Sequence, residues 1–107
     1  MRRVEVSASA KADIDRATVW HENQKEGLGD RFLNAVLDTI DRIALNPQGY
    51  SKVIREARKA DVRKFPYSVW FKVQDDVLVI ACLHERRDRV LARERASGIV
   101  EIPKGPD

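Results

Sequence analysis

Basic residues gathered in the second half of the chain are the feature of this sequence best suited to chemistry. Residues 1–50 carry 7 Lys and Arg against 8 Asp and Glu, whereas residues 51–107 carry 13 against 9. A one-sided positive field attracts polyanions such as nucleic acid, a phosphate-lined ribosomal site or an acidic partner protein. His84 lies in the same half, and histidine is the side chain whose unperturbed pKa lies near neutral pH. The alternative interpretation of these cations is a solvated strand face.

Two helices are predicted in the first half of the chain. Apolar residues recur at three- and four-residue spacing over residues 8–26, which contain no Gly or Pro, and a broader apolar stripe follows over residues 28–45. Gly27 ends the first helix because glycine readily adopts the positive φ of a helix C-cap. Pro47 ends the second, because proline disfavours helical geometry in the residue before it. The sequence therefore predicts a helical hairpin with a tight turn.

Strands are predicted on both sides of this hairpin, because apolar and polar residues there alternate with a period of two. They cover residues 4–6, 60–64, 67–73 and 77–84, and the last is apolar on both faces, as in a covered central strand. The predicted fold class is α+β in the order β-α-α-β-β-β, an antiparallel sheet backed by a two-helix hairpin. Residues 90–96 suit a short helix before a C-terminal arm. We therefore predict a domain over residues 1–96 and a tail over residues 97–107.

Several classes of protein are disfavoured by the composition. The longest apolar run has seven residues, far fewer than the roughly 20 of a membrane span, so no membrane association is predicted. A single cysteine, Cys82, cannot form an internal disulfide, which suits a cytoplasmic protein. Cys82 and His84 are two metal ligands at most, and there is no glycine-rich phosphate loop and no Gly-x-Ser-x-Gly motif. We predict no metal and no cofactor.

Several short motifs, in order along residues 4–89, resemble the RelE/ParE toxin superfamily, and specifically its ParE-like branch of plasmid-stabilisation proteins. The matching residues are Ala12-Asp13-Ile14, Trp20-His21-Glu22, Gly27-Leu28-Gly29, Arg31-Phe32, Asn46-Pro47, Tyr50, Arg58, Arg63-Lys64-Phe65-Pro66-Tyr67, His84 and Arg86-Arg87-Asp88. One departure is Arg89, because members of the family usually have proline after the Arg-Asp pair. The residues beyond Ala96 match nothing in the family's pattern.

The resemblance implies a cytoplasmic growth-inhibiting toxin of a type II toxin–antitoxin system, neutralised by a cognate antitoxin protein. ParE-like members act on DNA gyrase, which is the expected target. RelE-like members instead cleave messenger RNA on the ribosome, and this ribosome-dependent endonuclease is the alternative. An inactive antitoxin-binding module is a third interpretation. Whether the chain is an enzyme therefore stays open at this point, with a binding-type inhibitor favoured.

Candidate site residues follow from these alternatives. RNA cleavage by 2′-hydroxyl attack needs a base, cations for the phosphorane charge and a donor to the leaving 5′ oxygen. The candidate catalytic residues are Arg58, Arg63, Lys64, His84, Arg86 and Arg87. For target binding the candidates are Arg58, Arg63, Lys64, Arg86, Arg87 and Arg89.

Three aromatic residues, Trp20, Tyr67 and Trp70, are the candidates for contact with an antitoxin. Trp70 lies on the strand face opposite Val69 and Phe71. Something besides the helical hairpin must therefore cover one of these faces, either a bound partner or the C-terminal segment folded back.

Overall fold

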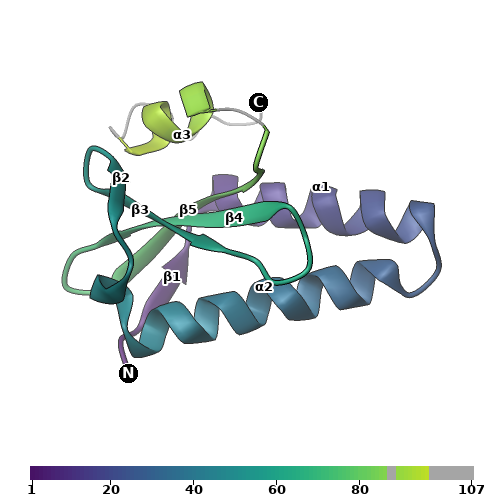
Figure 1. Cartoon of the computed structure of the whole chain (residues 1–107), viewed down its shortest axis with the longest axis horizontal. Coiled ribbons are helices and arrows are strands. Elements are labelled where there is room, and N and C mark those ends of the chain that lie inside the picture. Colours follow the sequence, from purple (N-terminus) through teal and green to yellow (C-terminus); the bar gives the residue numbers. More distant parts are fainter. Residues whose placement is uncertain (87–88, 97–107) are drawn as a thin grey trace.

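The computed structural model describes residues 1–86 and 89–96, and its sheet lies between two helical layers (Figure 1). The strands are β1 (Val4–Val6), β2 (Lys52–Ile54), β3 (Ala57–Asp61), β4 (Tyr67–Val73) and β5 (Val77–His84). The helices are α1 (Ala8–Gln24), α2 (Leu28–Leu45), the short 3-10 helix η1 (Pro47–Gly49) and α3 (Arg89–Ala96). The α1–α2 hairpin covers one face of the sheet and α3 the other, which confirms the predicted α+β class.

The sheet has the order β1-β5-β4-β3-β2 and is mixed. Strands β3, β4 and β5 form the predicted antiparallel meander, whereas β1 pairs in parallel with β5, from Val77 to Val79 only. The predicted antiparallel meander is therefore confirmed, and β1 adds a parallel edge whose pairing the sequence analysis did not assign. Strand β2, which pairs antiparallel with β3, was not predicted.

The first strand of the meander lies earlier than predicted, over Ala57–Asp61 instead of residues 60–64. The Val62 N–H donates to the Tyr67 carbonyl at 2.9 Å and closes a turn, in which Lys64 has a φ of 69°. A non-glycine residue seldom adopts this left-handed conformation, so no residue type marks the start of the turn ahead of Phe65-Pro66.

The helical hairpin depends on hydrogen bonds at the N-termini of its two helices, α1 and α2. The Ser7 hydroxyl accepts a hydrogen bond from the Ala10 N–H at 3.1 Å and caps α1. The Glu22 carboxylate accepts from the N–H groups of Gly27 (3.0 Å) and Gly29 (2.9 Å), and these bonds lower the pKa of Glu22. One side chain of α1 thereby satisfies two of the N–H groups at the start of α2.

The core has two parts because both faces of β5 are covered. On the hairpin side, buried residues of the helices pack against alternate residues of the sheet; the fully buried large side chains there are Phe32, Val36, Ile43, Val69, Phe71, Val77 and Val79. On the other side, Trp70 and Ile80 pack with Ala92 and Ala96 of α3. The folded-back C-terminal segment thus covers Trp70.

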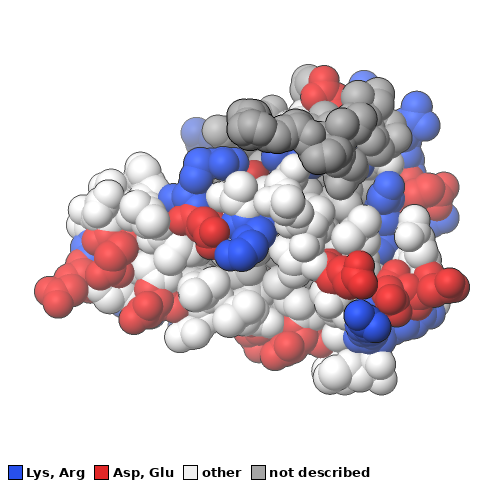
Figure 2. All heavy atoms as spheres, turned by 180° about the vertical axis from the view of Figure 1, so that it is seen from behind, with Lys and Arg blue, Asp and Glu red and all other residues white. Residues whose placement is uncertain are grey.

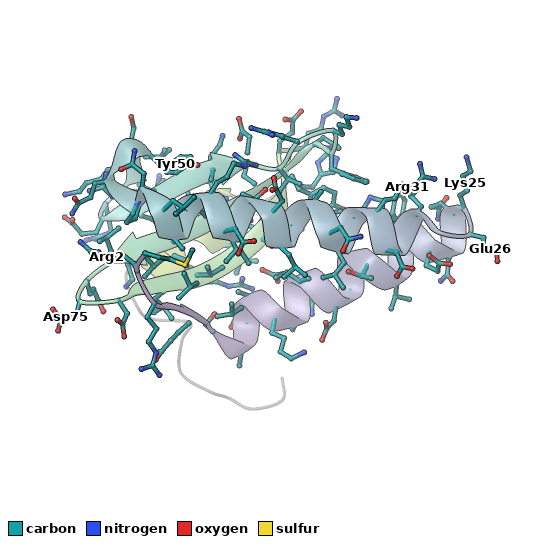
Figure 3. All side chains as sticks on the ribbon, turned by 90° about the horizontal axis from the view of Figure 1, so that it is seen from below. Arg2, Lys25, Glu26, Arg31, Tyr50 and Asp75 are labelled. Atoms are coloured by element: carbon teal, nitrogen blue, oxygen red, sulfur yellow. The ribbon has the colours of Figure 1, made fainter. Side chains whose placement is uncertain are left out.

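Seen from below, α2 lies along the sheet and the hairpin extends past it (Figure 3). Arg2, Tyr50 and Asp75 lie at one end of the molecule, and Lys25 lies with the hairpin turn at the other. None of the helices in the described part of the chain is long and apolar enough to cross a membrane.

Replacing Gly29 tests the close approach of α1 and α2. A Cβ atom at Gly29 would lie 2.8 Å from the Thr18 carbonyl oxygen and 2.9 Å from Glu22 Cβ. Overpacking costs about 1–3 kcal/mol, which exceeds the roughly 1 kcal/mol that alanine adds in helix propensity. We expect Gly29→Ala to lower the free energy of unfolding in urea. Asn34→Ala, on the exposed face of α2, is the control and should change it by less than about 0.5 kcal/mol; equal stability of both variants would contradict this packing.

Candidate functional site

A buried carboxylate joins α1, β5 and α3. Asp13 and Arg95 are each 5% exposed, and the Arg95 guanidinium contacts both carboxylate oxygens of Asp13, at 2.5 and 3.3 Å. The same carboxylate accepts the Cys82 N–H at 3.0 Å and an N–H of Arg16 at 2.9 Å. Arg95 also donates to the Ile80 carbonyl at 3.1 Å. Asp13 is therefore the point at which three elements meet.

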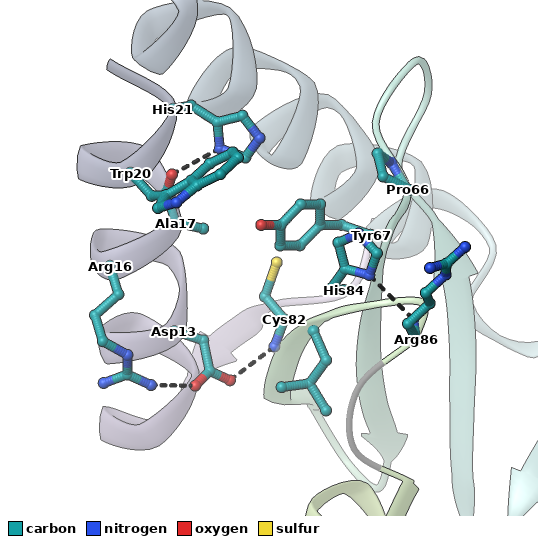
Figure 4. Close-up of a pocket in the computed structure, with 11 residues that line it drawn as sticks. Asp13, Arg16, Ala17, Trp20, His21, Pro66, Tyr67, Cys82, His84 and Arg86 are labelled. Atoms are coloured by element: carbon teal, nitrogen blue, oxygen red, sulfur yellow. Dashed lines mark hydrogen bonds and ion pairs between the residues drawn. The ribbon is translucent and has the colours of Figure 1, made fainter. Parts of the chain in front are cut away.

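A pocket of about 670 Å³ lies beside this carboxylate, between α1 and the end of β5 (Figure 4). Helix α1 contributes residues 13–21, the β3–β4 turn contributes Pro66, and the ends of β4 and β5 contribute the rest of the lining. The labelled side chains of Trp20, Tyr67 and His84 surround the opening in Figure 4. Cavities of this size are large enough for small ligands or for side chains of a partner.

Aromatic rings form one wall of the pocket. His21 is buried, donates from Nδ1 to the Ala17 carbonyl at 2.7 Å and stacks on Phe32 with ring centroids 4.5 Å apart. Tyr67 lies 5.4 Å from the His21 ring and 5.2 Å from the His84 ring. Interlocked rings of this kind hold a pocket wall in a fixed shape.

His84 ends β5 and is partly buried. Its Nδ1 accepts the Arg86 N–H at 3.1 Å, so His84 is paired with a backbone group two residues ahead. An imidazole nitrogen that accepts a hydrogen bond does so through its lone pair, so this contact occupies Nδ1. While the contact is held, Nε2 is the ring nitrogen open to proton transfer.

The predicted cations do not all share one cleft. Arg58 lies opposite Phe71, on the hairpin face of the sheet, and donates to the Tyr50 carbonyl at 2.6 Å. Its half-buried side chain is thus used to hold the segment after α2. The pocket lining includes Arg86 and His84 but not Arg58, Arg63 or Lys64.

Arg63 and Lys64 instead form an exposed rim together with Arg86. Arg63 and Lys64 lie in the β3–β4 turn, and Arg86 follows β5 at the same end of the sheet. A hydrogen bond of 2.7 Å from the Glu85 N–H to the Pro66 carbonyl joins the two segments. We call Arg63, Lys64 and Arg86 the basic rim.

Seen from behind, one group of Lys and Arg side chains lies near the middle of the molecule, and carboxylates lie at both ends (Figure 2). The predicted residues Arg87 and 97–107 lie outside the described residues. Of Arg89, the structure describes the backbone at the start of α3.

The three aromatic residues predicted to face an antitoxin have different surroundings. Trp20 is 56% exposed at the mouth of the pocket and Tyr67 is partly buried inside it. Trp70 is 6% exposed beneath α3, and Lys59 lies 5.9 Å above its ring. Trp70 could meet a partner only if α3 moved away, so contact with a partner stays a prediction for Trp20 and Tyr67.

Asp13 and Arg95 were missed by the sequence analysis as functional residues. A signal existed, because Asp13 falls on the buried face of α1 between Ala10 and Ala17. Arg95 likewise falls on the buried face of α3, between Ala92 and Ala96. A charged residue within an apolar helical stripe indicates a buried partner, although it does not say which one.

A family model described as the ParE toxin of the type II toxin–antitoxin system parDE matches residues 4–89. The chain belongs to the ParE toxin family. A chain from a solved structure titled "Chromosomal ParDE TA system from P. aeruginosa" has the same fold, with a TM-score of 0.60 and 18% sequence identity. The match covers 78% of this chain and 96% of that chain. No curated protein sequence matches the chain.

Removing one member of the buried ion pair in this ParE toxin should destabilise it strongly. Asp13→Ala leaves the Arg95 guanidinium buried without its counter-charge, which typically costs about 3–5 kcal/mol. The control is Asp15→Ala, because Asp15 pairs with Lys11 on the exposed face of α1 and such pairs contribute about 0–1 kcal/mol. Urea unfolding gives both values. The double variant Asp13→Ala/Arg95→Met should lose less than the sum of the single variants; strict additivity would show that the pair is not coupled.

The buried thiol predicts how stability depends on pH. Burial, with the nearby charge of Asp13, raises the pKa of Cys82 to about 12, whereas an unfolded cysteine has a pKa of about 8.5. Below the unfolded value the thiol is protonated in both states. Above it the unfolded chain loses the proton first, so the free energy of unfolding falls with pH, by up to roughly 1.4 kcal/mol per unit. Urea unfolding at pH 7, 9 and 10 should show a steeper fall for the natural toxin than for Cys82→Ala; parallel curves would contradict it.

Proposed function

We propose that this ParE-family toxin stops growth in the cytoplasm by binding DNA gyrase, and that a cognate antitoxin neutralises it. The observation that carries the proposal is the basic rim. Arg63, Lys64 and Arg86 are exposed at one end of the sheet, where the Glu85–Pro66 hydrogen bond joins their two backbone segments. A group of exposed cations suits recognition of an acidic protein surface or of nucleic acid bound to a protein.

Binding is favoured over RNA cleavage by the placement of the candidate catalytic groups. Arg58 is committed to the Tyr50 carbonyl, on the hairpin face of the sheet. No tyrosine follows Tyr67 in the sequence to act as a C-terminal acid. Among the described residues of the predicted catalytic set, His84 and Arg86 line the pocket. They could supply one proton-transfer group and one cation of the three functions that 2′-hydroxyl attack requires.

The ribosome-dependent endonuclease is retained as the second candidate because His84, Arg86 and Tyr67 line one pocket. Purified toxin separates the two activities. We expect inhibition of DNA supercoiling by gyrase and no new cleavage sites in messenger RNA by primer extension on translating ribosomes. Cleavage without loss of supercoiling would establish the endonuclease instead. Unimpaired growth after induction of the chain alone would favour an inactive antitoxin-binding module.

Charge reversal tests the role of the basic rim. The variant Arg63→Glu/Arg86→Glu should need at least a tenfold higher concentration than the natural toxin for half-inhibition of gyrase, because rim charges set the rate of encounter. Arg3→Glu is the control, since Arg3 is an exposed cation whose backbone pairs with Val77, at the opposite end of β5 from the rim. It should stay within about twofold. Equal inhibition by the rim variant and by Arg3→Glu would remove the basic rim from target binding.

A further inference from the structure

The edge of β5 is only partly covered. Strand β1 pairs with it from Val77 to Val79, and the Ser7 N–H donates to the Val79 carbonyl at 2.9 Å before the chain enters α1. Beyond this point side chains take the place of a neighbouring strand. Arg95 donates to the Ile80 carbonyl and Asp13 accepts the Cys82 N–H. Both are buried substitutes for strand pairing, which protects an edge from indiscriminate association.

Two backbone groups further along this edge have no such substitute. Alternate residues of a strand direct their N–H and C=O groups to opposite sides. The Glu85 N–H points toward β4, where it donates to the Pro66 carbonyl, and the Cys82 N–H points away from β4 toward Asp13. The His84 N–H and the Cys82 C=O therefore point away from β4 as well, toward the pocket. Within residues 1–86 and 89–96 neither group has a hydrogen-bond partner.

We infer that an extended segment of the antitoxin adds to β5 at Cys82 and His84 and inserts an apolar side chain into the pocket. This inference rests on the proposed function. A peptide supplies both groups that the edge requires, a C=O for the His84 N–H and an N–H for the Cys82 carbonyl. A DNA backbone offers phosphate acceptors but no donor for the Cys82 carbonyl, and an RNA backbone offers a donor only through its 2′-hydroxyl. The alternating N–H and C=O groups of an extended peptide fit the edge better.

The pocket beside the edge defines the side chains of that segment. Trp20 and Tyr67 provide an apolar wall, and the 56% exposure of Trp20 is surface that a partner would bury. Arg16, whose side chain is 70% exposed, and the exposed Arg86 line the same pocket from opposite sides. Asp13 is already neutralised by Arg95. The segment therefore carries an apolar side chain for the pocket with a carboxylate next to it in sequence.

The buried carboxylate also limits how far the added segment extends. Because Asp13 occupies the Cys82 N–H, a partner strand can pair with the last residues of β5 but not with those before Cys82. The segment must then leave the sheet across α1, past Trp20. The contact is therefore a short strand of two or three residues joined to an apolar anchor.

A proline substitution tests the edge directly. His84→Pro removes the outward N–H, whereas His84→Ala, the matched control, removes the imidazole and keeps the N–H. The probe is the purified antitoxin encoded beside the toxin, and its Kd is measured by titration calorimetry. We expect His84→Pro to bind at least tenfold more weakly than His84→Ala, because the peptide carbonyl is left without its donor. Trp20→Ala should weaken binding more than Val19→Ala, since Val19 is 59% exposed but outside the pocket lining.

Hydrogen exchange of the natural toxin provides a test that does not depend on a variant. The amide proton of His84 should exchange rapidly in the free toxin and become protected when antitoxin is added. Normal antitoxin binding with no protection of His84, or equal Kd values for His84→Pro and His84→Ala, would overturn the strand addition and leave the proposed function intact. No binding of antitoxin by the natural toxin would overturn both. Protection of the His84 amide proton by an oligonucleotide, and not by the antitoxin, would also overturn the strand addition.

Discussion

The contact between the Asp13 carboxylate and the Arg95 guanidinium is the interaction on which the other features depend. Burying two charges is costly unless hydrogen bonds satisfy them, and here the Cys82 N–H, the Ile80 carbonyl and Arg16 do so. The contact holds α3 against the sheet, which keeps Trp70 covered. It also occupies the edge of β5 just beyond β1. The pocket lies further along, between α1 and the end of β5.

This arrangement gives the molecule two distinct surfaces, the basic rim and the pocket, which the sequence alone does not tell apart. The basic rim lies at the end of the sheet, fixed by the Glu85–Pro66 hydrogen bond. The pocket beside α1 has an apolar wall and an open strand edge. Arg86 belongs to both, since it is exposed in the rim and lines the pocket. A partner in the pocket would therefore cover part of the rim, and under the proposed function the antitoxin and the target would compete for Arg86.

The fold was largely predictable because its signals are local. The period of 3.6 identified the helical hairpin, and the doubly apolar residues 77–84 identified a strand covered on both sides. Strand β2 was not predictable, because it has three residues and its turn contains Arg55 at a φ of 53°, with no glycine to mark it. The same reason, a left-handed Lys64 in the following turn, explains why β3 ends at Asp61 and not at residue 64.

The site was less predictable because its contacts join residues far apart in the sequence. Asp13 meets Arg95, which lies 82 residues further along the chain, and Arg58 meets a backbone carbonyl that carries no residue-type signal. For Trp70, the sequence left a partner and the folded-back C-terminal segment as alternatives, and only the position of α3 chose between them. The sequence analysis named Arg63 and Lys64 as candidates but placed them on a strand. In the structure they lie in the exposed turn after β3, and Arg58 lies within β3.

The central claim is that the pocket and open edge beside α1 receive the antitoxin while the buried ion pair stays in place. A crystal structure of the toxin with its antitoxin tests this most directly. The account predicts an antitoxin chain running past Trp20 to the end of β5, with Asp13 and Arg95 still paired and α3 still covering Trp70. An antitoxin chain seated on the Trp70 face in place of α3, with the pocket empty, would contradict it.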